Sequence, residues 1–211
     1  MQFRAKLILV TLLAVAAIGT GNAQSAGTSG SDTIQYTWSE NVPPIALKTN
    51  LLYDLALVPN IGIEVAIGRH WTVGFDWFHT WISSDSRHRY WQGYGCYIGG
   101  RYYFGGERFT GHHVGAYALG MTYDVEWGGR GYQAATFGWG GGVEYGYSRR
   151  ISTHFNLAFT LGLGFQDGEY KEYDPKDGHY VWQSTHKRHW WGPTRAEVSL
   201  VWMIGRKGVR R

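Results

Sequence analysis

Residues 155–166 read FNLAFTLGLGFQ, and this stretch decides the fold of the chain. Every odd-numbered position holds Phe or Leu, and the even-numbered positions hold Asn, Ala, Thr, Gly or Gln. Successive side chains of a β-strand point to opposite faces, so the alternation predicts a strand with one apolar face.

The same alternation recurs along the chain and predicts eight strands. Their ranges are 46–55, 61–68, 71–81, 91–104, 113–124, 135–147, 155–166 and 194–204. The apolar face of these strands contains no Asp, Glu, Lys or Arg, although 17% of the chain is charged. Lipid contact explains this absence, because Lys or Arg near the bilayer midplane costs about 2–4 kcal/mol. The sequence therefore predicts an all-β fold, an eight-stranded antiparallel transmembrane β-barrel.

A soluble ligand-binding barrel and a β-sandwich are the rival folds. In either, the less apolar face would meet water and be rich in Lys and Glu. Here 18 of the 44 residues on that face are Gly or Ala, and only nine are charged. The interior of a narrow barrel has this composition, because small residues leave room for a few large polar side chains.

Aromatic residues gather near the ends of the predicted strands, as they do at the two interfaces of a membrane barrel. One predicted rim consists of Trp71, Tyr102, Phe104, Tyr145, Tyr147 and Trp202. The other consists of Tyr53, Trp77, Trp81, Tyr123 and Phe165.

The first 23 residues have the pattern of an export signal. Arg4 and Lys6 precede an apolar run over 7–18, and Ala23 ends a short segment of small residues at the expected cleavage site. The run is too short for a membrane-spanning helix. We expect a flexible periplasmic segment over 24–44, the barrel over 45–205, and a basic periplasmic tail over 206–211.

Composition excludes several other classes of protein. A formal charge of +4 on 211 residues does not indicate a nucleic-acid partner, and one cysteine excludes a disulfide framework. The predicted fold instead implies contact with outer-membrane lipid and with the barrel-assembly machinery during insertion. No cofactor is predicted.

Several short motifs add a family resemblance. They are KTNLLYD at 48–54, PNIGIE at 59–64, RYYF at 101–104, YGYS at 145–148, GPT at 192–194 and VSLVW at 198–202. Together they resemble a domain-of-unknown-function family of outer-membrane barrels. The resemblance implies an eight-stranded barrel in Gram-negative bacteria, often encoded beside fimbrial genes, and hence a possible surface or fimbrial protein partner. It implies no established activity and no catalytic residues.

Nine charged residues are predicted to face the barrel interior, because they alternate along their strands with the residues of the apolar face. They are Lys48, Asp54, Glu64, Asp76, Arg101, Asp124, Glu144, Arg195 and Glu197. We expect most of them to form a salt-bridge network that fills the interior, because eight strands enclose only enough room for side chains. Arg101 and Glu144 are expected at the same depth, paired across the interior. The alternative is an ion or proton path through a narrow pore. A methyl group added at Gly162 is expected to be tolerated there.

The longest predicted loop, 167–193, is a candidate for recognition, because loops on a rigid scaffold often carry binding. Its aromatic residues are Tyr170, Tyr173, Tyr180, Trp182, Trp190 and Trp191. The alternative is a loop that folds over the barrel mouth and rests these side chains at the membrane interface.

An enzyme that modifies lipid, similar to a lipid A deacylase or acyltransferase, is the remaining functional alternative. It needs a Ser oriented by a His and an acid. The chain offers STH at 152–154 and at 184–186, and SDS at 84–86 near His88. Polar turns explain all three. The histidines His112, His113, His179, His186 and His189 do not have metal-site spacing, so no metal is predicted.

Overall fold

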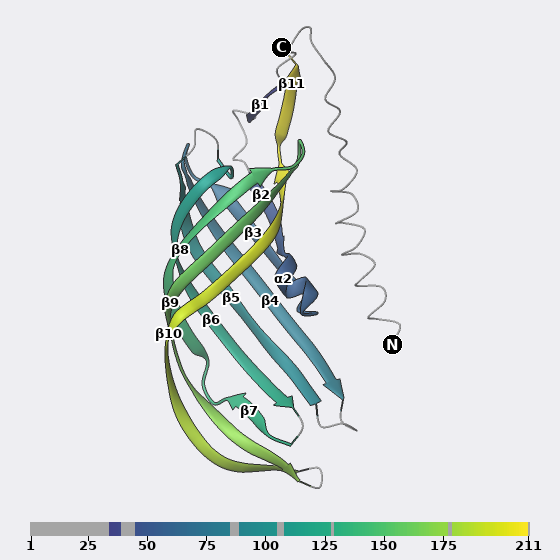
Figure 1. Cartoon of the computed structure of the whole chain (residues 1–211), viewed down its shortest axis with the longest axis vertical. Coiled ribbons are helices and arrows are strands. Elements are labelled where there is room, and N and C mark those ends of the chain that lie inside the picture. The colour runs from purple at the N-terminus through teal and green to yellow at the C-terminus, as the bar shows by residue number, and fades with distance from the viewer. Residues whose placement is uncertain are drawn as a thin grey trace.

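The computed structural model describes residues 34–38, 45–84, 89–104, 108–127, 129–176 and 179–210. The fold is all-β, as predicted, and its main element is an antiparallel sheet of nine strands that closes in a ring (Figure 1). These strands are β2 (Ile45–Asn50), β3 (Asn60–Ala66), β4 (Trp71–Ser84), β5 (Arg89–Tyr103), β6 (Gly111–Trp127), β7 (Gly131–Ala134), β8 (Gly138–Arg150), β9 (Phe155–Lys176) and β10 (His179–Ile204).

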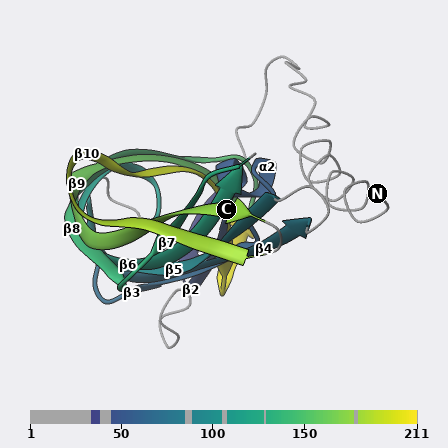
Figure 2. The ribbon, with the colours of Figure 1, turned by 90° about the horizontal axis from the view of Figure 1, so that it is seen from below.

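Pairing of the first strand with the last closes the ring. β10 pairs with β2 from Ser199 opposite Asn50 to Ile204 opposite Ile45, and each long strand pairs with the next along the chain. Over these six residue pairs, closure removes the exposed sheet edge that would promote aggregation. Figure 2 shows the strands surrounding the interior, viewed from the end at which β9 and β10 project. We call this the hairpin end.

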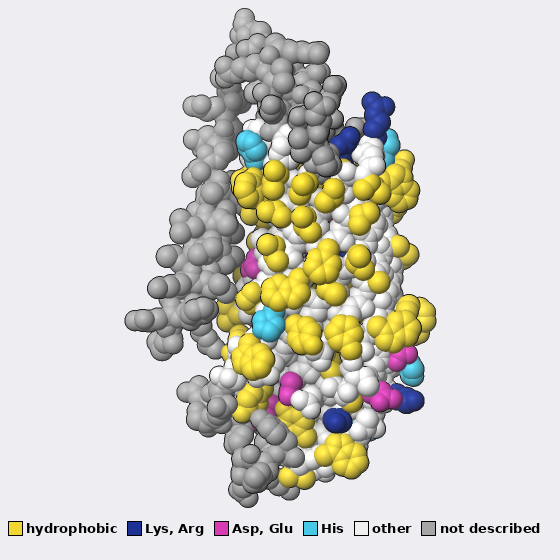
Figure 3. Space-filling model, turned by 180° about the vertical axis from the view of Figure 1, so that it is seen from behind, with side chains coloured by type: hydrophobic (Ala, Val, Ile, Leu, Met, Phe, Trp, Pro, Cys, Tyr) yellow, Lys and Arg dark blue, Asp and Glu magenta, His cyan; other side chains and the backbone are white. Residues whose placement is uncertain are grey.

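Large apolar side chains cover the outward face of the ring (Figure 3). Examples on β9 are Phe159, Leu161 and Leu163, which are 47%, 55% and 54% exposed. The even-numbered neighbours Ala158, Thr160 and Gly162 are buried. The period-two pattern of the sequence therefore sets the facing of this strand as predicted.

The first predicted strand ends earlier than expected. β2 stops at Asn50, and a single short helix, α2 (Leu51–Leu55), follows it. The Asn50 side chain caps this helix by accepting from the Leu52 N–H. It also donates to the Ala196 carbonyl and accepts from the Val198 N–H, so it joins the helix to β10. Among the described residues, no helix is long and apolar enough to cross a membrane.

The predicted facing of β6 is wrong. His113, Tyr117 and Leu119 point inward and are buried, whereas the prediction placed Tyr123 on the outer rim and Asp124 inside. The interior has room for the Tyr117 ring because glycines lie beside it: methyl groups at Gly142 and Gly162 would lie 2.8 and 2.6 Å from Tyr117 Oη. The Tyr117 ring thus occupies the inner face because glycines of β8 and β9 leave space for it.

The predicted loop over 167–193 is also wrong. β9 and β10 continue as one long hairpin, paired from Trp202 opposite Phe155 to His179 opposite Lys176 (Figure 1). The alternation of apolar and small residues stops near residue 166, so the paired extension has no apolar face to mark it as strand. The short strand β7 pairs with both β6 and β9 and was not predicted.

A small ribbon lies at the opposite end of the molecule. β1 (Ile34–Trp38) pairs with β11 (Arg206–Arg210) in a separate two-stranded antiparallel sheet. The prediction of a flexible segment over 24–44 is therefore corrected for residues 34–38, because they pair with residues 206–210 of the predicted basic tail. The predicted signal peptide and residues 24–33 and 39–44 lie outside the described residues.

Substitution of Gly162 by Ala is expected to destabilise the protein, contrary to the tolerance predicted from sequence. The new methyl group would lie 2.6 Å from Tyr117 Oη and 2.9 Å from Arg195 Cβ, inside contact distance. We expect a loss of about 1–3 kcal/mol in the free energy of unfolding in detergent. Gly74→Ala is the matched control, because its nearest neighbour, the Ile63 carbonyl oxygen, is 3.5 Å away. Equal stability of the two variants would contradict this packing.

Candidate functional site

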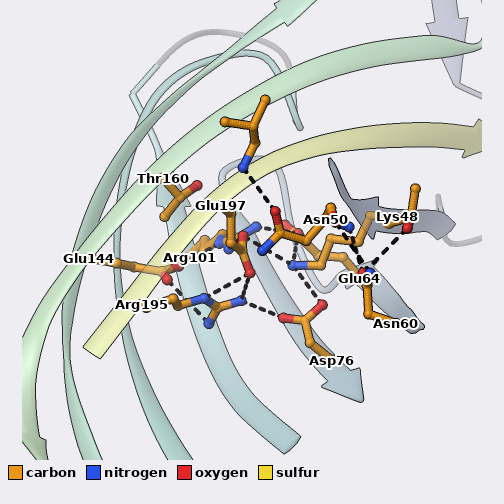
Figure 4. A network of polar contacts seen from close by, with 12 residues as sticks. Lys48, Asn50, Asn60, Glu64, Asp76, Arg101, Glu144, Thr160, Arg195 and Glu197 are labelled. Carbon is orange, nitrogen blue, oxygen red and sulfur yellow. Dashed lines mark hydrogen bonds and ion pairs between the residues drawn. The ribbon is translucent and has the colours of Figure 1, made fainter. Parts of the chain in front are cut away.

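A cluster of buried charges crosses the interior of the ring (Figure 4). It contains the seven residues that the sequence predicts for the network, contributed by β2, β3, β4, β5, β8 and β10. They are Lys48, Glu64, Asp76, Arg101, Glu144, Arg195 and Glu197. Because six strands contribute, the cluster links walls of the ring that share no backbone hydrogen bonds.

Arg101 is the centre of this cluster. Its Nε donates to Glu144 at 2.5 Å, and its two terminal nitrogens donate to Glu64 at 2.8 Å and to Glu197 at 3.0 Å. The side chain is 6% exposed. Arg101 on β5 and Glu144 on β8 both lie opposite Gly115 of β6, so they share one depth as predicted, but they pair over this glycine and not across the whole interior.

Arg195 forms the second centre. It pairs with Glu144 at 3.2 Å and with Glu197 and Asp76 through one terminal nitrogen. Its guanidinium also lies over the Tyr97 ring, 4.8 Å from the ring centroid. A planar guanidinium suits this combination of several carboxylates and an aromatic face, which an ammonium group would not match.

The third cation, Lys48, lies 2.9 Å from Asp76 and within 3.9 Å of Glu64 and Glu197. Three cations therefore face four carboxylates. Neutral donors add to the binding of Glu64, since Thr72 donates to it at 2.6 Å and Tyr103 donates to it at 3.0 Å. The four carboxylates are thus bound by protein groups drawn from several walls of the ring.

Two of the nine predicted interior charges lie outside this cluster. Asp54 is on α2 and accepts from Thr49 and Asn60, each at 2.9 Å. Asp124 lies near the hairpin end and accepts from Tyr173 and Gln133. The early end of β2 explains the first displacement, and the reversed facing of β6 explains the second.

A layer of tyrosines covers the cluster, and sequence reasoning missed the inward facing of two of them, Tyr53 and Tyr117. The hydroxyls of Tyr53 and Tyr97 are 3.3 Å apart, and Tyr97 donates to the Thr194 carbonyl at 3.2 Å. The Tyr117 hydroxyl is 2.5 Å from Thr194 Oγ1. Tyr53 was predicted on an outer rim. It points inward because the helix α2 replaces the last residues of the predicted strand. The LLY sequence after the Asn50 cap is the signal that could have identified this helix.

The aromatic residues of the hairpin occupy different environments. Tyr173 is 5% exposed, whereas Trp182 and Trp191 are 62% and 76% exposed. The Tyr170 ring packs against the His186 ring at 5.3 Å. Trp190 donates to the Pro193 carbonyl at 3.3 Å. The side chain of Tyr180 lies outside the described residues. The predicted recognition residues therefore do not form one surface.

The Ser184–His186 pair has part of the geometry of a nucleophilic site. Ser184 Oγ lies 2.7 Å from His186 Nε2, and Glu172 approaches the same ring nitrogen at 3.8 Å. In a catalytic triad the acid holds the other ring nitrogen. Here Glu172 approaches the nitrogen that faces the serine and also pairs with Arg130 at 3.1 Å, and no ion pair among the described residues joins an acid to the other ring nitrogen. Residues 85–88, part of the third Ser/His grouping, lie outside the described residues.

No group of three or more His, Cys, Asp or Glu residues in the described part of the chain is arranged to hold a metal ion. The paired histidines point to opposite faces of β6. His113 contacts Thr160 inside at 3.2 Å, and His112 contacts the Tyr145 hydroxyl outside at 2.6 Å. They cannot share one ligand.

Comparison with known proteins gives one match. The model of a family described as proteins of unknown function, DUF3575, matches residues 14–204. The chain belongs to the DUF3575 family. The match covers all nine strands of the closed sheet and therefore includes the charged cluster and the long hairpin. No curated protein and no solved structure matches the chain.

Proposed function

We propose that this DUF3575 protein is a non-enzymatic outer-membrane β-barrel whose interior is plugged by side chains and whose hairpin end is presented outside the cell. The observation that carries the proposal is the reversed distribution of polarity. Exposed apolar side chains surround the ring, while Arg101, Glu144 and Glu197 are buried inside it. A water-soluble ring would have the opposite arrangement, because burial of apolar side chains is its main source of stability.

Aromatic clusters mark both limits of this apolar zone. At the hairpin end, Phe165 packs against Trp139 at 5.3 Å and against Trp191 at 5.5 Å. At the other end, Trp71 packs against Tyr102 at 5.1 Å. Beyond Phe165 the outward positions of β9 become Asp167, Glu169 and Lys171. This order, apolar zone, then aromatics, then charges, matches a membrane core, its interface and the aqueous phase.

The proposal predicts where the protein is found in the cell. Fractionation of the native bacterium is expected to recover the mature chain, beginning near Gln24, in the outer membrane. The folded protein should migrate differently on SDS gels before and after boiling. Recovery in the soluble periplasm would reject the membrane assignment. Cell-surface protease accessibility of the β9–β10 hairpin tests the orientation.

The charged cluster predicts that the wild-type protein does not form a large pore. Because Arg101, Arg195 and Lys48 are bound to carboxylates in the interior, we expect no continuous water path at this depth. Purified protein in planar bilayers is expected to give no steady conductance steps, with a porin preparation as the positive control. Steady porin-sized steps would favour the pore alternative.

Presentation of a surface at the hairpin end also fits a supporting role in assembly of surface appendages. We infer such a protein partner only from the resemblance to barrels encoded beside fimbrial genes. Deletion of the gene, followed by quantification of surface fimbriae, tests this role. Normal assembly of fimbriae in the absence of the protein would contradict this role.

A further inference from the structure

Two adjacent cross-strand rows of side chains lie on one face of the sheet at the hairpin end. There β5, β6, β7, β9 and β10 are neighbours. The first row, in register from β5 to β10, is Gln92, Asp124, Gln133, Lys171 and Thr185. The second row is Tyr90, Glu126, Gly131, Tyr173 and Trp182. Residues opposite one another in neighbouring strands share a face, so the rows form one continuous surface.

This surface encloses a cavity of about 530 Å³. Its lining is Tyr90, Gln92, Asp124, Gln133, Lys171, Tyr173, Trp182 and Thr185. The volume lies within the range of sites that bind one small ligand, and the lining combines aromatic rings with a few polar groups, as such sites do.

Contacts within the lining hold it in place. Tyr173 Oη donates to Asp124 at 2.7 Å, and the Gln133 amide donates to the other oxygen of Asp124 at 3.0 Å. Trp182 Nε1 donates to Thr185 at 3.2 Å, which fixes the indole while its ring stays 62% exposed. The site is therefore partly organised before any ligand arrives, which lowers the entropic cost of binding.

Two polar groups of the lining remain available. No hydrogen bond or ion pair joins the side chain of Gln92 or Lys171 to another residue in the described part of the chain. The Asp124 carboxylate also has lone pairs beyond the two that Tyr173 and Gln133 use. These groups thus offer hydrogen-bond donors and acceptors beside the exposed indole of Trp182. The lining contains one acid, Asp124, and one base, Lys171.

A sugar ring matches this combination, because it presents an apolar C–H face to an aromatic ring and a rim of hydroxyls that both donate and accept. We propose that the two rows form a saccharide-binding site, with Trp182 as the stacking platform and Gln92, Lys171 and Asp124 as hydroxyl partners. The inference deepens the proposed function and rests on it for the exposure of this face outside the cell.

The place of the site suggests two sources for the sugar. Lys171 lies six positions beyond Phe165, which is in the aromatic cluster at the edge of the apolar zone. The residues of both rows occupy the alternate positions that face outward along their strands. Tyr94 on β5 and Leu163 on β9 occupy the same outward-facing positions. A sugar headgroup of a membrane glycolipid and a soluble oligosaccharide can both reach such a surface, and their recognition chemistry is shared.

The test uses the purified full-length protein in detergent, probed with an array of soluble oligosaccharides of two to four units. A second arm compares nanodiscs that contain lipopolysaccharide with nanodiscs of phospholipid alone. We expect saccharide binding in at least one arm, and at least tenfold weaker binding by Trp182→Ala. Trp191→Ala is the matched control, because Trp191 lies on the same hairpin outside the cavity and should leave binding unchanged.

Several outcomes would overturn the site. One is the absence of saccharide binding in both arms by protein whose heat-dependent gel migration shows that it is folded. Another is an equal loss of binding in the Trp182 and Trp191 variants. A third is equal binding to nanodiscs with and without lipopolysaccharide and no binding to the oligosaccharides. Cell fractionation keeps this result separate from the proposed function. An outer-membrane protein that binds no saccharide would reject only the site, and a soluble periplasmic protein that binds one would reject only the membrane assignment.

Discussion

Leu161→Arg is expected to prevent assembly of the proposed membrane barrel or to destabilise it by about 2–4 kcal/mol. Leu161 is 55% exposed on the outward face of β9, opposite Tyr145 and Ala196 on the neighbouring strands. It lies between the aromatic clusters at the two limits of the apolar zone, so in the proposed outer-membrane barrel the new charge would sit inside the hydrocarbon. The measurement is the fraction of folded protein in the outer membrane, together with unfolding in detergent or vesicles.

Two controls isolate the charge from its position. Leu161→Ala shortens the same side chain but stays apolar, and it should assemble. Glu169→Arg places the same guanidinium on the same face of β9 beyond the apolar zone. It breaks only the exposed pair with Lys187, at 3.7 Å, which contributes little. Equal insertion of Leu161→Arg and wild type would contradict lipid contact at this face.

Arg101→Met is expected to lower the free energy of unfolding by about 3–5 kcal/mol. The substitution removes a cation bonded to Glu64, Glu144 and Glu197, and it leaves these carboxylates buried with fewer partners. A buried charge without its partner costs more than the pair contributes. The loss is measured on refolded protein in detergent. The shift in gel migration with temperature reports its unfolding.

Lys187→Met is the matched control, because it removes an exposed cation at 3.7 Å from its partner and should cost less than about 1 kcal/mol. A double variant adds a further test. Glu144→Gln in the Arg101→Met background should cost less than the two single effects together, since the two residues are bonded at 2.5 Å. Additive losses, or an unchanged unfolding temperature in Arg101→Met, would remove the assigned role of this cluster.

The sequence by itself determined the class of fold and the facing of most strands. In residues 155–166, apolar and small residues alternate without interruption, and a strand puts alternate residues on opposite faces whatever surrounds it. The same local rule placed Lys48, Glu64, Arg101 and Glu144 inside. Their pairing could be anticipated because charges confined in one narrow space must compensate one another.

Tertiary structure decided the features that depend on neighbours far along the chain. Tyr117 points inward because Gly142 and Gly162, on β8 and β9, leave space for its ring, and no pattern within β6 reports that space. The hairpin beyond residue 166 is strand because β9 and β10 pair with each other, although neither has an apolar face there.

The rows at the hairpin end were equally hidden. Gln92 and Lys171 come from strands far apart in sequence, and only the register through β6 and β7 aligns them. Alternation along one strand gives the facing of each side chain. The position of that side chain relative to another strand is set by backbone pairing across the sheet, which only the closed structure defines.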